Sequence, residues 1–468
     1  MGRTANEKSA VDAIRSAWAA LFCLCFLTVI LMELRGSMHP VAIAAAALLI
    51  AFSLFFGLKW EIPKFGLWIF CAAFLVRLAV ILCVPTPAES DFSLLFSASE
   101  SLINGDRTFL NDVYFQNWTY QVGMVAWQAV FLKLWDNILM LKIVNCVICS
   151  LTVLLVYLIA SEIASKKAAQ TAAILYCFLP FPLFYTVILS NQFPASFFIY
   201  AAFWIAISKR LNLKKWIRYL IFGVLLALAN VLRPESIIPL FAAVLMLIFS
   251  MRRGNWRENL LCAAIAVISY MLLFRLISAA FSASGLAPGG LTNNAVYWKF
   301  LLGLNQASGG GYSNDDTVYL GNSAAAWAKV RSRAAAPLPQ LIKLFMTKMR
   351  TFWSGGSVDW TFAWCMNEEL SLFGRHFTVA GFANIATEII RLCSCVIYAF
   401  VVLGCLRLVR RGGKSDGVML LIDQTFVTSG VYMLIEVQQR YIYGAQIGVI
   451  ILSALGVQAL RDITAKKK

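Results

Sequence analysis

The stretch Pro85–Asp106, PTPAESDFSLLFSASESLINGD, follows a long apolar run. Its two prolines predict that a membrane-spanning helix has just ended, because proline cannot continue the helical hydrogen-bond ladder. Apolar residues then recur at helical spacing from Phe92 to Ile103, and Gly105 is placed as a helix C-cap. The pattern predicts a short amphipathic helix that lies on a membrane and is too short to cross it.

Two carboxylates, Glu89 and Asp91, precede this helix at the point where the chain leaves the bilayer. A carboxylate at the boundary between water and lipid, beside an interfacial helix, favours chemistry on a lipid headgroup. Ordinary solvated loop residues would produce the same pattern. This stretch alone therefore leaves both interpretations open.

The composition is that of an integral membrane protein. Of the 468 residues, 60% are hydrophobic and 13% are charged, whereas soluble proteins have about 45–50% apolar and about 25% charged residues. The sequence therefore predicts an all-α polytopic membrane protein. The formal net charge of +17 does not indicate nucleic-acid binding, because most basic residues lie in short loops where membrane topology explains them.

About twelve apolar runs are long enough to cross a bilayer, which needs about 17–25 residues. With the N-terminus inside, loops rich in Lys and Arg alternate with loops that hold few, which predicts cytoplasmic termini and a multi-pass protein of the plasma (inner) membrane. We expect one domain over residues 1–468, with outer loops at 85–142 and 278–388. The predicted spans are Ala17–Met32, Val41–Gly57, Phe65–Val84, Ile143–Ala160, Ala168–Val187, Phe193–Ile207, Tyr219–Leu232, Ile237–Phe249, Leu260–Ile277, Ile390–Leu406, Val418–Ile435 and Gly444–Leu460.

The segment Tyr120–Trp135, YQVGMVAWQAVFLKLW, is apolar enough to be mistaken for a further span. Counting it as a span would place Lys166 and Lys167 outside and invert every later basic loop. We therefore predict a second surface helix here, anchored in the membrane interface by its tryptophans.

Unusual polar residues from three distant segments fall at the outer ends of predicted spans, where ionisable groups are costly. Arg233 and Arg440 are candidates for a phosphate clamp, since a guanidinium offers a forked pair of donors. Snorkelling, or an ion pair between Arg233 and Glu235, would explain these residues without function. The three segments are Asp91; Arg233, Pro234 and Glu235; and Glu436, Val437, Gln438, Gln439, Arg440 and Tyr441.

The second outer loop holds basic amphipathic stretches over Ala325–Arg333 and Leu338–Trp353. In the first of them, Lys329 and Arg331 are candidates for holding an anionic lipid carrier, although simple contact with an anionic lipid surface explains them as well. These stretches predict further interfacial helices.

Several enzyme signatures are absent from the sequence, among them the Walker A loop, the dinucleotide fingerprint, HExxH and GxSxG. His39 and His376 are the only histidines, and neither has metal-ligand spacing around it. We therefore expect no metal site and no cofactor, while divalent-metal dependence stays open.

A set of loose motifs runs through most of the chain. The motifs are Ser90-Asp91-Phe92 with Ala98, Leu102 and Gly105; Tyr114, Tyr120 and Gly123; Asn145, Tyr157 and Ala160; Phe178-Leu179-Pro180; Arg233-Pro234; and Gln439-Arg440-Tyr441. Together they resemble the GT-C class of integral membrane glycosyltransferases. More narrowly, the set is similar to the bacterial group related to protein O-mannosyltransferases and the lipid A aminoarabinose transferase.

The resemblance implies transfer of a sugar from a polyprenyl-phosphate carrier to a glycan, lipid or protein acceptor on the extracytoplasmic side. It implies that Asp91 is the catalytic base or orients the acceptor, and that Arg440 and Tyr441 stabilise the leaving phosphate. The chain departs from the family pattern where relatives carry an acid near Asn191, and where they carry a second carboxylate after the first. Glu89 is a candidate replacement for the latter.

Two other functions fit parts of the sequence. An O-antigen-ligase or polymerase-like enzyme also combines about a dozen spans with a large late outer loop, although here the surface helices follow Asp91 early in the chain. A transporter or flippase of a lipid-linked sugar would need polar residues along a path through the spans, and the sequence has few.

Overall fold

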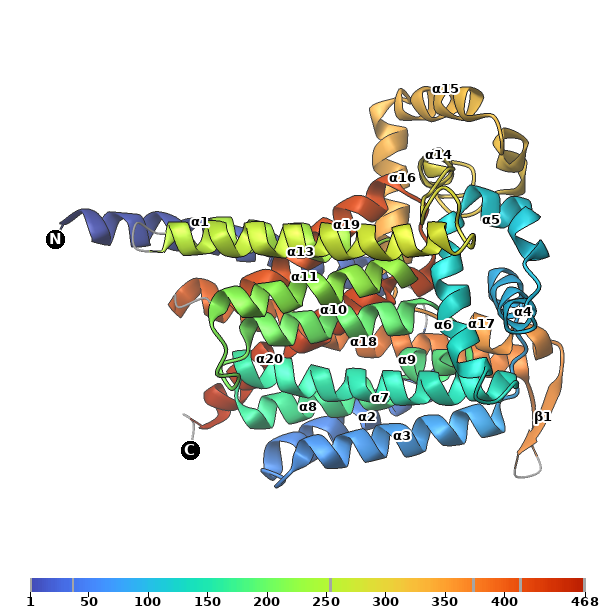
Figure 1. Ribbon diagram of the computed structural model, residues 1–468. Coiled ribbons are helices and arrows are strands. Elements are labelled where there is room, and N and C mark those ends of the chain that lie inside the picture. Colours follow the sequence, from blue (N-terminus) through green and yellow to red (C-terminus); the bar gives the residue numbers. More distant parts are fainter. Residues whose placement is uncertain (1, 36–37, 252–254, 373–374, 412–414, 466–468) are drawn as a thin grey trace.

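The computed structural model describes residues 2–35, 38–251, 255–372, 375–411 and 415–465. Its long helices run side by side in one bundle (Figure 1), which confirms the predicted all-α polytopic membrane protein. The bundle helices are α1 (Gly2–Glu33), α2 (Pro40–Lys59), α3 (Phe65–Cys83), α7 (Ile138–Ile163), α8 (Lys166–Phe178), α10 (Gln192–Ile207), α11 (Lys215–Leu232), α12 (Ile237–Phe249), α13 (Trp256–Ala283), α18 (Val379–Arg411), α19 (Asp416–Leu434) and α20 (Tyr443–Ala465).

Each predicted span falls on a bundle helix. Within the described residues, nine helices are long and apolar enough to cross a membrane. A tenth candidate is α8 together with α9 (Pro180–Phe184) and η3 (Tyr185–Val187), a pair bent by 55° at Pro180, which lacks the backbone N–H that would continue the helix. Helices α10 and α12 are apolar but have only 16 and 13 residues. The number of twelve spans therefore stays a prediction.

The predicted amphipathic helix after Asp91 is present as α4 (Asp91–Ile103). It ends as predicted at Gly105, whose φ of 81° is left-handed. The amides of Gly105 and Asp106 donate to the carbonyls of Leu102 and Ser101, which is the Schellman arrangement. The same connection continues through η1 (Thr108–Asn111), α5 (Val113–Asn117), η2 (Thr119–Gln121) and α6 (Val122–Leu132).

Helix α6 accounts for the apolar segment Tyr120–Trp135 and lies across the end of the bundle (Figure 1). Gly123 lets it approach α11 closely, because a Cβ there would lie 2.0 Å from the carbonyl oxygen of Val231. The prediction that this segment is not a bundle helix is therefore confirmed.

The second long connection lies at the same end of the bundle. Its basic stretches form helices as predicted, and a short antiparallel hairpin pairs Glu369 with Thr378. The elements are α14 (Val296–Gly303), η4 (Asn314–Tyr319), α15 (Ser323–Ala334), α16 (Leu338–Trp353), α17 (Asp359–Phe362), η5 (Ala363–Cys365), β1 (Glu369–Leu372) and β2 (Arg375–Thr378).

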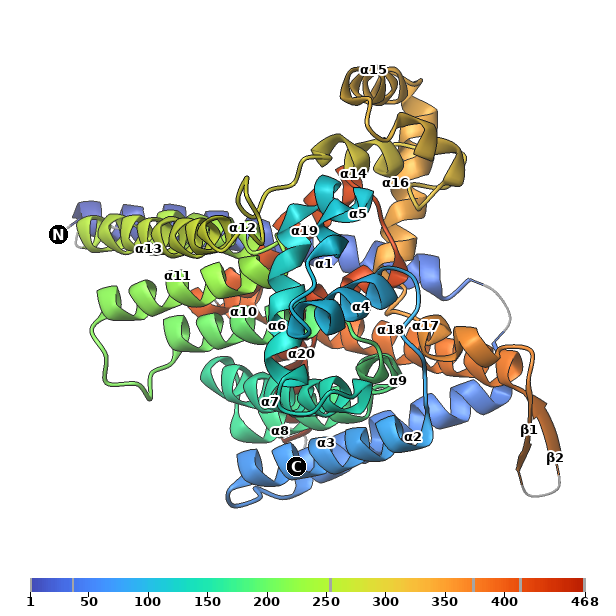
Figure 2. The same cartoon turned by 45° about the vertical axis from the view of Figure 1, so that its right-hand side comes forward.

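We call the end of the bundle that carries both connections the loop end. Figures 1 and 2 show that the described chain ends lie away from it. Hydrogen bonds join the two connections, from Tyr120 N to Thr292 O at 3.0 Å and from Asn294 N to Asn117 O at 2.9 Å. The division into a single domain with two outer loops stays a prediction.

Candidate active site

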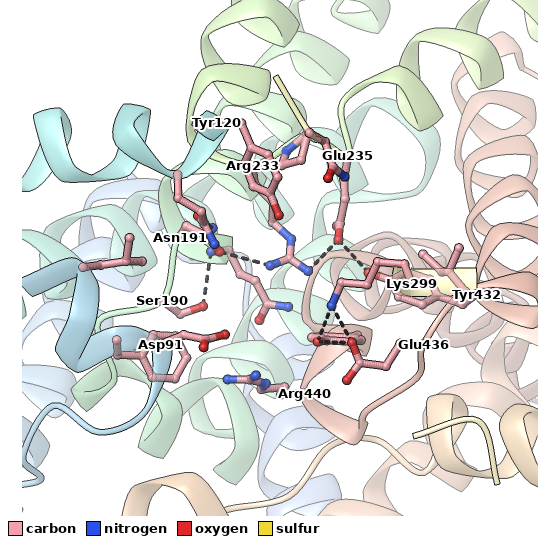
Figure 3. Close-up of a pocket in the computed structure, with 18 of the residues that line it drawn as sticks. Asp91, Tyr120, Ser190, Asn191, Arg233, Glu235, Lys299, Tyr432, Glu436 and Arg440 are labelled. Carbon is pink, nitrogen blue, oxygen red and sulfur yellow. Dashed lines mark hydrogen bonds and ion pairs between the residues drawn. The ribbon is translucent and has the colours of Figure 1, made fainter. Parts of the chain in front are cut away.

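A cavity of about 250 Å³ opens at the loop end (Figure 3). It lies where the two connections meet the ends of α10, α11 and α19 and the short helix η6 (Gln439–Ile442). Its wall contains the residues Asp91, Phe92, Leu95, Tyr120, Gln121, Tyr185, Ser190, Asn191, Gln192, Arg233, Pro234, Glu235, Asn293, Val296, Lys299, Phe300, Tyr432, Ile435, Glu436, Arg440 and Tyr441.

Asp91 is the first residue of α4 and lines the cavity with an exposed carboxylate. The residue before it, Ser90, has φ 54° and ψ −136°, a conformation that costs a non-glycine residue about 1–3 kcal/mol. Within the described part of the chain, the Asp91 carboxylate has no hydrogen-bond or ion-pair partner. The chain therefore holds a strained turn that presents a carboxylate with both oxygens free to accept.

Arg233 and Glu235 form an ion pair at 2.5 Å just after α11. Arg233 also donates to Asn191 Oδ1 at 3.0 Å, and Tyr432 donates to the same Glu235 oxygen at 2.7 Å. Burial acts to raise the pKa of Glu235, but the positive charge and hydrogen bond of Arg233 outweigh it and hold that pKa below its usual range. The pair is therefore charged and internally neutralised.

A second ion pair joins helix α14 to the segment that follows α19. Lys299, from α14, donates to Glu436, which follows α19, and Tyr441 donates to the same carboxylate at 3.3 Å. Burial acts against both charges, yet the neighbouring Tyr441 and Glu436 raise the pKa of Lys299, and the charge of Lys299 lowers the pKa of Glu436. Glu436 and Lys299 thus neutralise each other, as Arg233 and Glu235 do.

Arg440 differs from the other two cations of the wall because it has no carboxylate partner among the residues that the structure describes. Its Nε donates to Gln438 Oε1 at 2.8 Å, and the guanidinium stacks on Trp360 at 4.2 Å and Phe92 at 5.1 Å from the ring centroids. In Figure 3, Asp91 and Arg440 lie beside each other with no dashed line between them. The aromatic rings hold the guanidinium while its two terminal nitrogens stay available.

Further polar atoms of the wall also lack partners. Arg233 Nε and Gln192 Oε1 are buried and make no hydrogen bond within the described residues. Buried polar groups are normally paired, so such atoms are available to a ligand or to water. Burial raises the pKa of Tyr120 to about 12, so its hydroxyl is a neutral donor and acceptor at the wall.

Seven of the residues singled out in the sequence line this cavity: Asp91, Arg233, Pro234, Glu235, Glu436, Arg440 and Tyr441. Val437 and Gln438 do not line it, and neither do four residues that were proposed for the site. Glu89 lies before the strained turn, and Gln439 is the first residue of η6. Lys329 and Arg331 are on α15, which Figure 1 shows at the margin of the molecule.

Sequence reasoning missed Lys299 and Tyr432, and noted Glu436 without a role. Lys299 is the single charge in the apolar helix VYWKFLLG, and an isolated lysine in such a helix is a signal that could have been used. Tyr432 carried no comparable signal, because it lies among apolar residues of α19.

The described residues contain no group of three or more His, Cys, Asp or Glu side chains placed to hold a metal ion. Independence from metals and cofactors stays a prediction.

Comparison with known proteins supports the sequence resemblance. Residues 123–282 match the family model of dolichyl-phosphate-mannose-protein mannosyltransferases. The oligosaccharyltransferase of Archaeoglobus fulgidus in the apo form superimposes with a TM-score of 0.51 at 15% identity, over 87% of this chain and 51% of that chain. The chain shares the fold of this oligosaccharyltransferase.

Two other structures of the Archaeoglobus fulgidus oligosaccharyltransferase are also similar to this chain. One is tethered with an acceptor peptide and has a TM-score of 0.48 at 16% identity, over 87% of this chain and 50% of that one. The other, in complex with an inhibitory peptide and a dolichol-phosphate, has a TM-score of 0.47 at 15% identity, over 86% and 51%. The chain thus spans about half the length of the solved structures it matches. No curated protein matches it.

Proposed function

We propose that the chain is a glycosyltransferase that moves a sugar from a polyprenyl-phosphate carrier to an acceptor at the extracytoplasmic face of the plasma membrane. The observation that carries the proposal is the pair of free charges in one cavity. Asp91 has no donor partner and Arg440 has no acid partner in the described chain, and both line the cavity at the loop end. One accepts a proton and the other binds an anion.

In the proposed reaction, an acceptor hydroxyl attacks the anomeric carbon of the donor sugar. Asp91 takes the hydroxyl proton as general base, which suits an exposed carboxylate with no competing donors. The bond between the anomeric carbon and the phosphate oxygen breaks, and the phosphate leaves with the bonding electrons. Arg440 stabilises the negative charge that develops on it, with Tyr441 as a further hydrogen-bonding group.

The charges of the wall favour a monophosphate carrier. Arg233 is neutralised by Glu235 and Lys299 by Glu436, so Arg440 is the one lining cation of the described residues that keeps its full charge for a ligand. A pyrophosphate would call for a second uncompensated cation.

The size of the cavity supports a single sugar as the transferred group. Its volume of about 250 Å³ lies below the roughly 300–1,000 Å³ of pockets for drug-sized ligands. We infer a hexosyl or pentosyl transferase, with the amides and ion pairs of the wall binding the sugar hydroxyls.

The decisive experiment uses the full chain, purified and placed in liposomes with no ion gradient. Short-chain polyprenyl monophosphates that carry one radiolabelled hexose or pentose are added with membrane extract as the acceptor source, and release of polyprenyl phosphate is followed. We expect release that depends on the chain and on the acceptor. Transbilayer movement of intact donor without release would instead support a flippase and overturn the proposal.

A further inference from the structure

One lysine lies buried beneath the candidate site without lining it. Lys348, on α16, is 0% exposed. Its Nζ donates to three backbone carbonyls, those of Gly303 at 2.7 Å, Met433 at 2.8 Å and Ile435 at 2.8 Å. An ammonium has three hydrogens, so this arrangement uses all of them. Holding an ammonium out of water is costly, and the three bonds to carbonyl oxygens offset part of that cost.

The three carbonyls belong to the ends of the two helices that carry the second ion pair. Gly303 ends α14, four residues after Lys299, while Met433 and Ile435 flank the end of α19, just before Glu436. The two ends touch directly, because a Cβ at Gly303 would lie 2.3 Å from the carbonyl carbon of Ile435. A positive charge at these carbonyls also complements the negative C-terminal ends of both helices.

Two backbone bonds continue the same junction towards the site. Glu436 N donates to Lys299 O at 2.8 Å, and Val437 N donates to Gly310 O at 2.9 Å. Gly310 has φ 83°, and a Cβ on it would meet the Lys348 side chain at 2.7 Å, so the loop lies directly on the lysine stem. Residues 433–437 are thus fixed on several sides immediately before Arg440.

We propose that Lys348 is a positioning residue, which holds the ends of α14 and α19 together so that Lys299, Glu436 and Arg440 face the donor phosphate and sugar. Its effect on the reaction rests on the proposed function, whereas its effect on the backbone does not. The two can therefore be tested separately.

The first test is amide hydrogen exchange of the full chain without any substrate. In Lys348→Met, the amides of Glu436 and Val437 should exchange roughly tenfold faster or more, as expected when hydrogen bonds to a charged group are lost. Lys343→Met removes an exposed lysine from the same helix and should leave both amides unchanged. A folded Lys348→Met protein with wild-type exchange at these amides would overturn the proposal.

The second test measures transfer. Lys348→Met should raise the KM for the donor about tenfold, because the groups that bind it lose their alignment. In a Glu436→Gln background the same substitution should have a much smaller effect, since the ion pair it aligns is already lost. Fully additive effects would show that Lys348 acts elsewhere. If the wild-type protein releases no polyprenyl phosphate, the proposed function fails while the exchange result still stands.

Gly310→Ala covers the case in which Lys348→Met does not fold. Its Cβ displaces the lysine stem without removing the charge, so exchange at Glu436 and Val437 should again rise. Unchanged exchange in this variant would count against the proposal.

The pH dependence gives a third readout. Burial lowers the pKa of Lys348 to about 7, against the opposing charge of Glu436, the charged group that acts on it. A neutral amine has two hydrogens for three carbonyls. The donor KM of the wild-type protein should therefore rise as the pH increases through 7, and Lys348→Met should lack this step. The same step in both proteins would assign it to another group.

Discussion

Replacing Asp91 with Asn should separate activity from stability. The substitution keeps the shape of the side chain and removes its charge and its ability to accept a proton. No partner within the described residues loses a bond. The folded protein loses only the favourable interaction of the carboxylate with the first turn of α4, which is about 0.3–1 kcal/mol. A positioned general base contributes about 10²–10⁴ to a rate, or about 2.7–5.4 kcal/mol of barrier.

We therefore expect Asp91→Asn to lower kcat by about 10²–10⁴, with a nearly unchanged melting temperature in detergent and little change in the donor KM. The assay is release of polyprenyl phosphate in liposomes with matched protein content. Glu89→Gln removes a carboxylate two positions earlier that does not line the cavity, and it should keep wild-type activity. Normal kcat in Asp91→Asn, or an equal loss in Glu89→Gln, would show that Asp91 is not the general base.

Three other predictions test two residues of the wall and two candidates outside it. Arg440→Gln should lower kcat/KM for the donor by roughly 10²–10³, the loss of two charge-assisted hydrogen bonds to phosphate, and single-turnover release would measure it. Tyr432→Phe removes the 2.7 Å bond to the charged Glu235 carboxylate; it should reduce the free energy of unfolding by about 1.5–3 kcal/mol, seen as a lower melting temperature. Lys329 and Arg331 do not line the cavity, so Lys329→Gln and Arg331→Gln should keep the wild-type donor KM in detergent. A tenfold rise in that KM would show that these residues bind the donor.

The fold was largely predictable because a bilayer imposes strong patterns of apolar runs and basic loops on a sequence. Each apolar run became a helix, and the positive-inside rule correctly kept Tyr120–Trp135 out of the bundle. The 55° bend at Pro180 was less visible. A proline indicates an interruption, but the direction of the next turn depends on packing against other helices.

The site was predictable only where a charge stood at the end of a span. Asp91, Arg233 and Arg440 met this condition, and the structure brings them to one cavity. Lys299 did not, because the fold of a long outer loop is set by contacts between distant residues. Lys329 and Arg331 were singled out by local charge alone, which cannot tell a side chain that lines the cavity from one that lies elsewhere on the outer loop.

The amide at Asn191 shows how the wall compensates for a departure in sequence. The family resemblance leads one to expect an acid near this position, and an amide there would leave Arg233 without a counter-charge. In the structure, Asn191 accepts one hydrogen bond from Arg233, while Glu235 supplies the negative charge from two residues further along the chain. Placing the acid at Glu235 and not at position 191, just before α10, leaves the net charge of the wall unchanged. It also keeps Arg440 as the cation for the phosphate, which is the condition the proposed reaction requires.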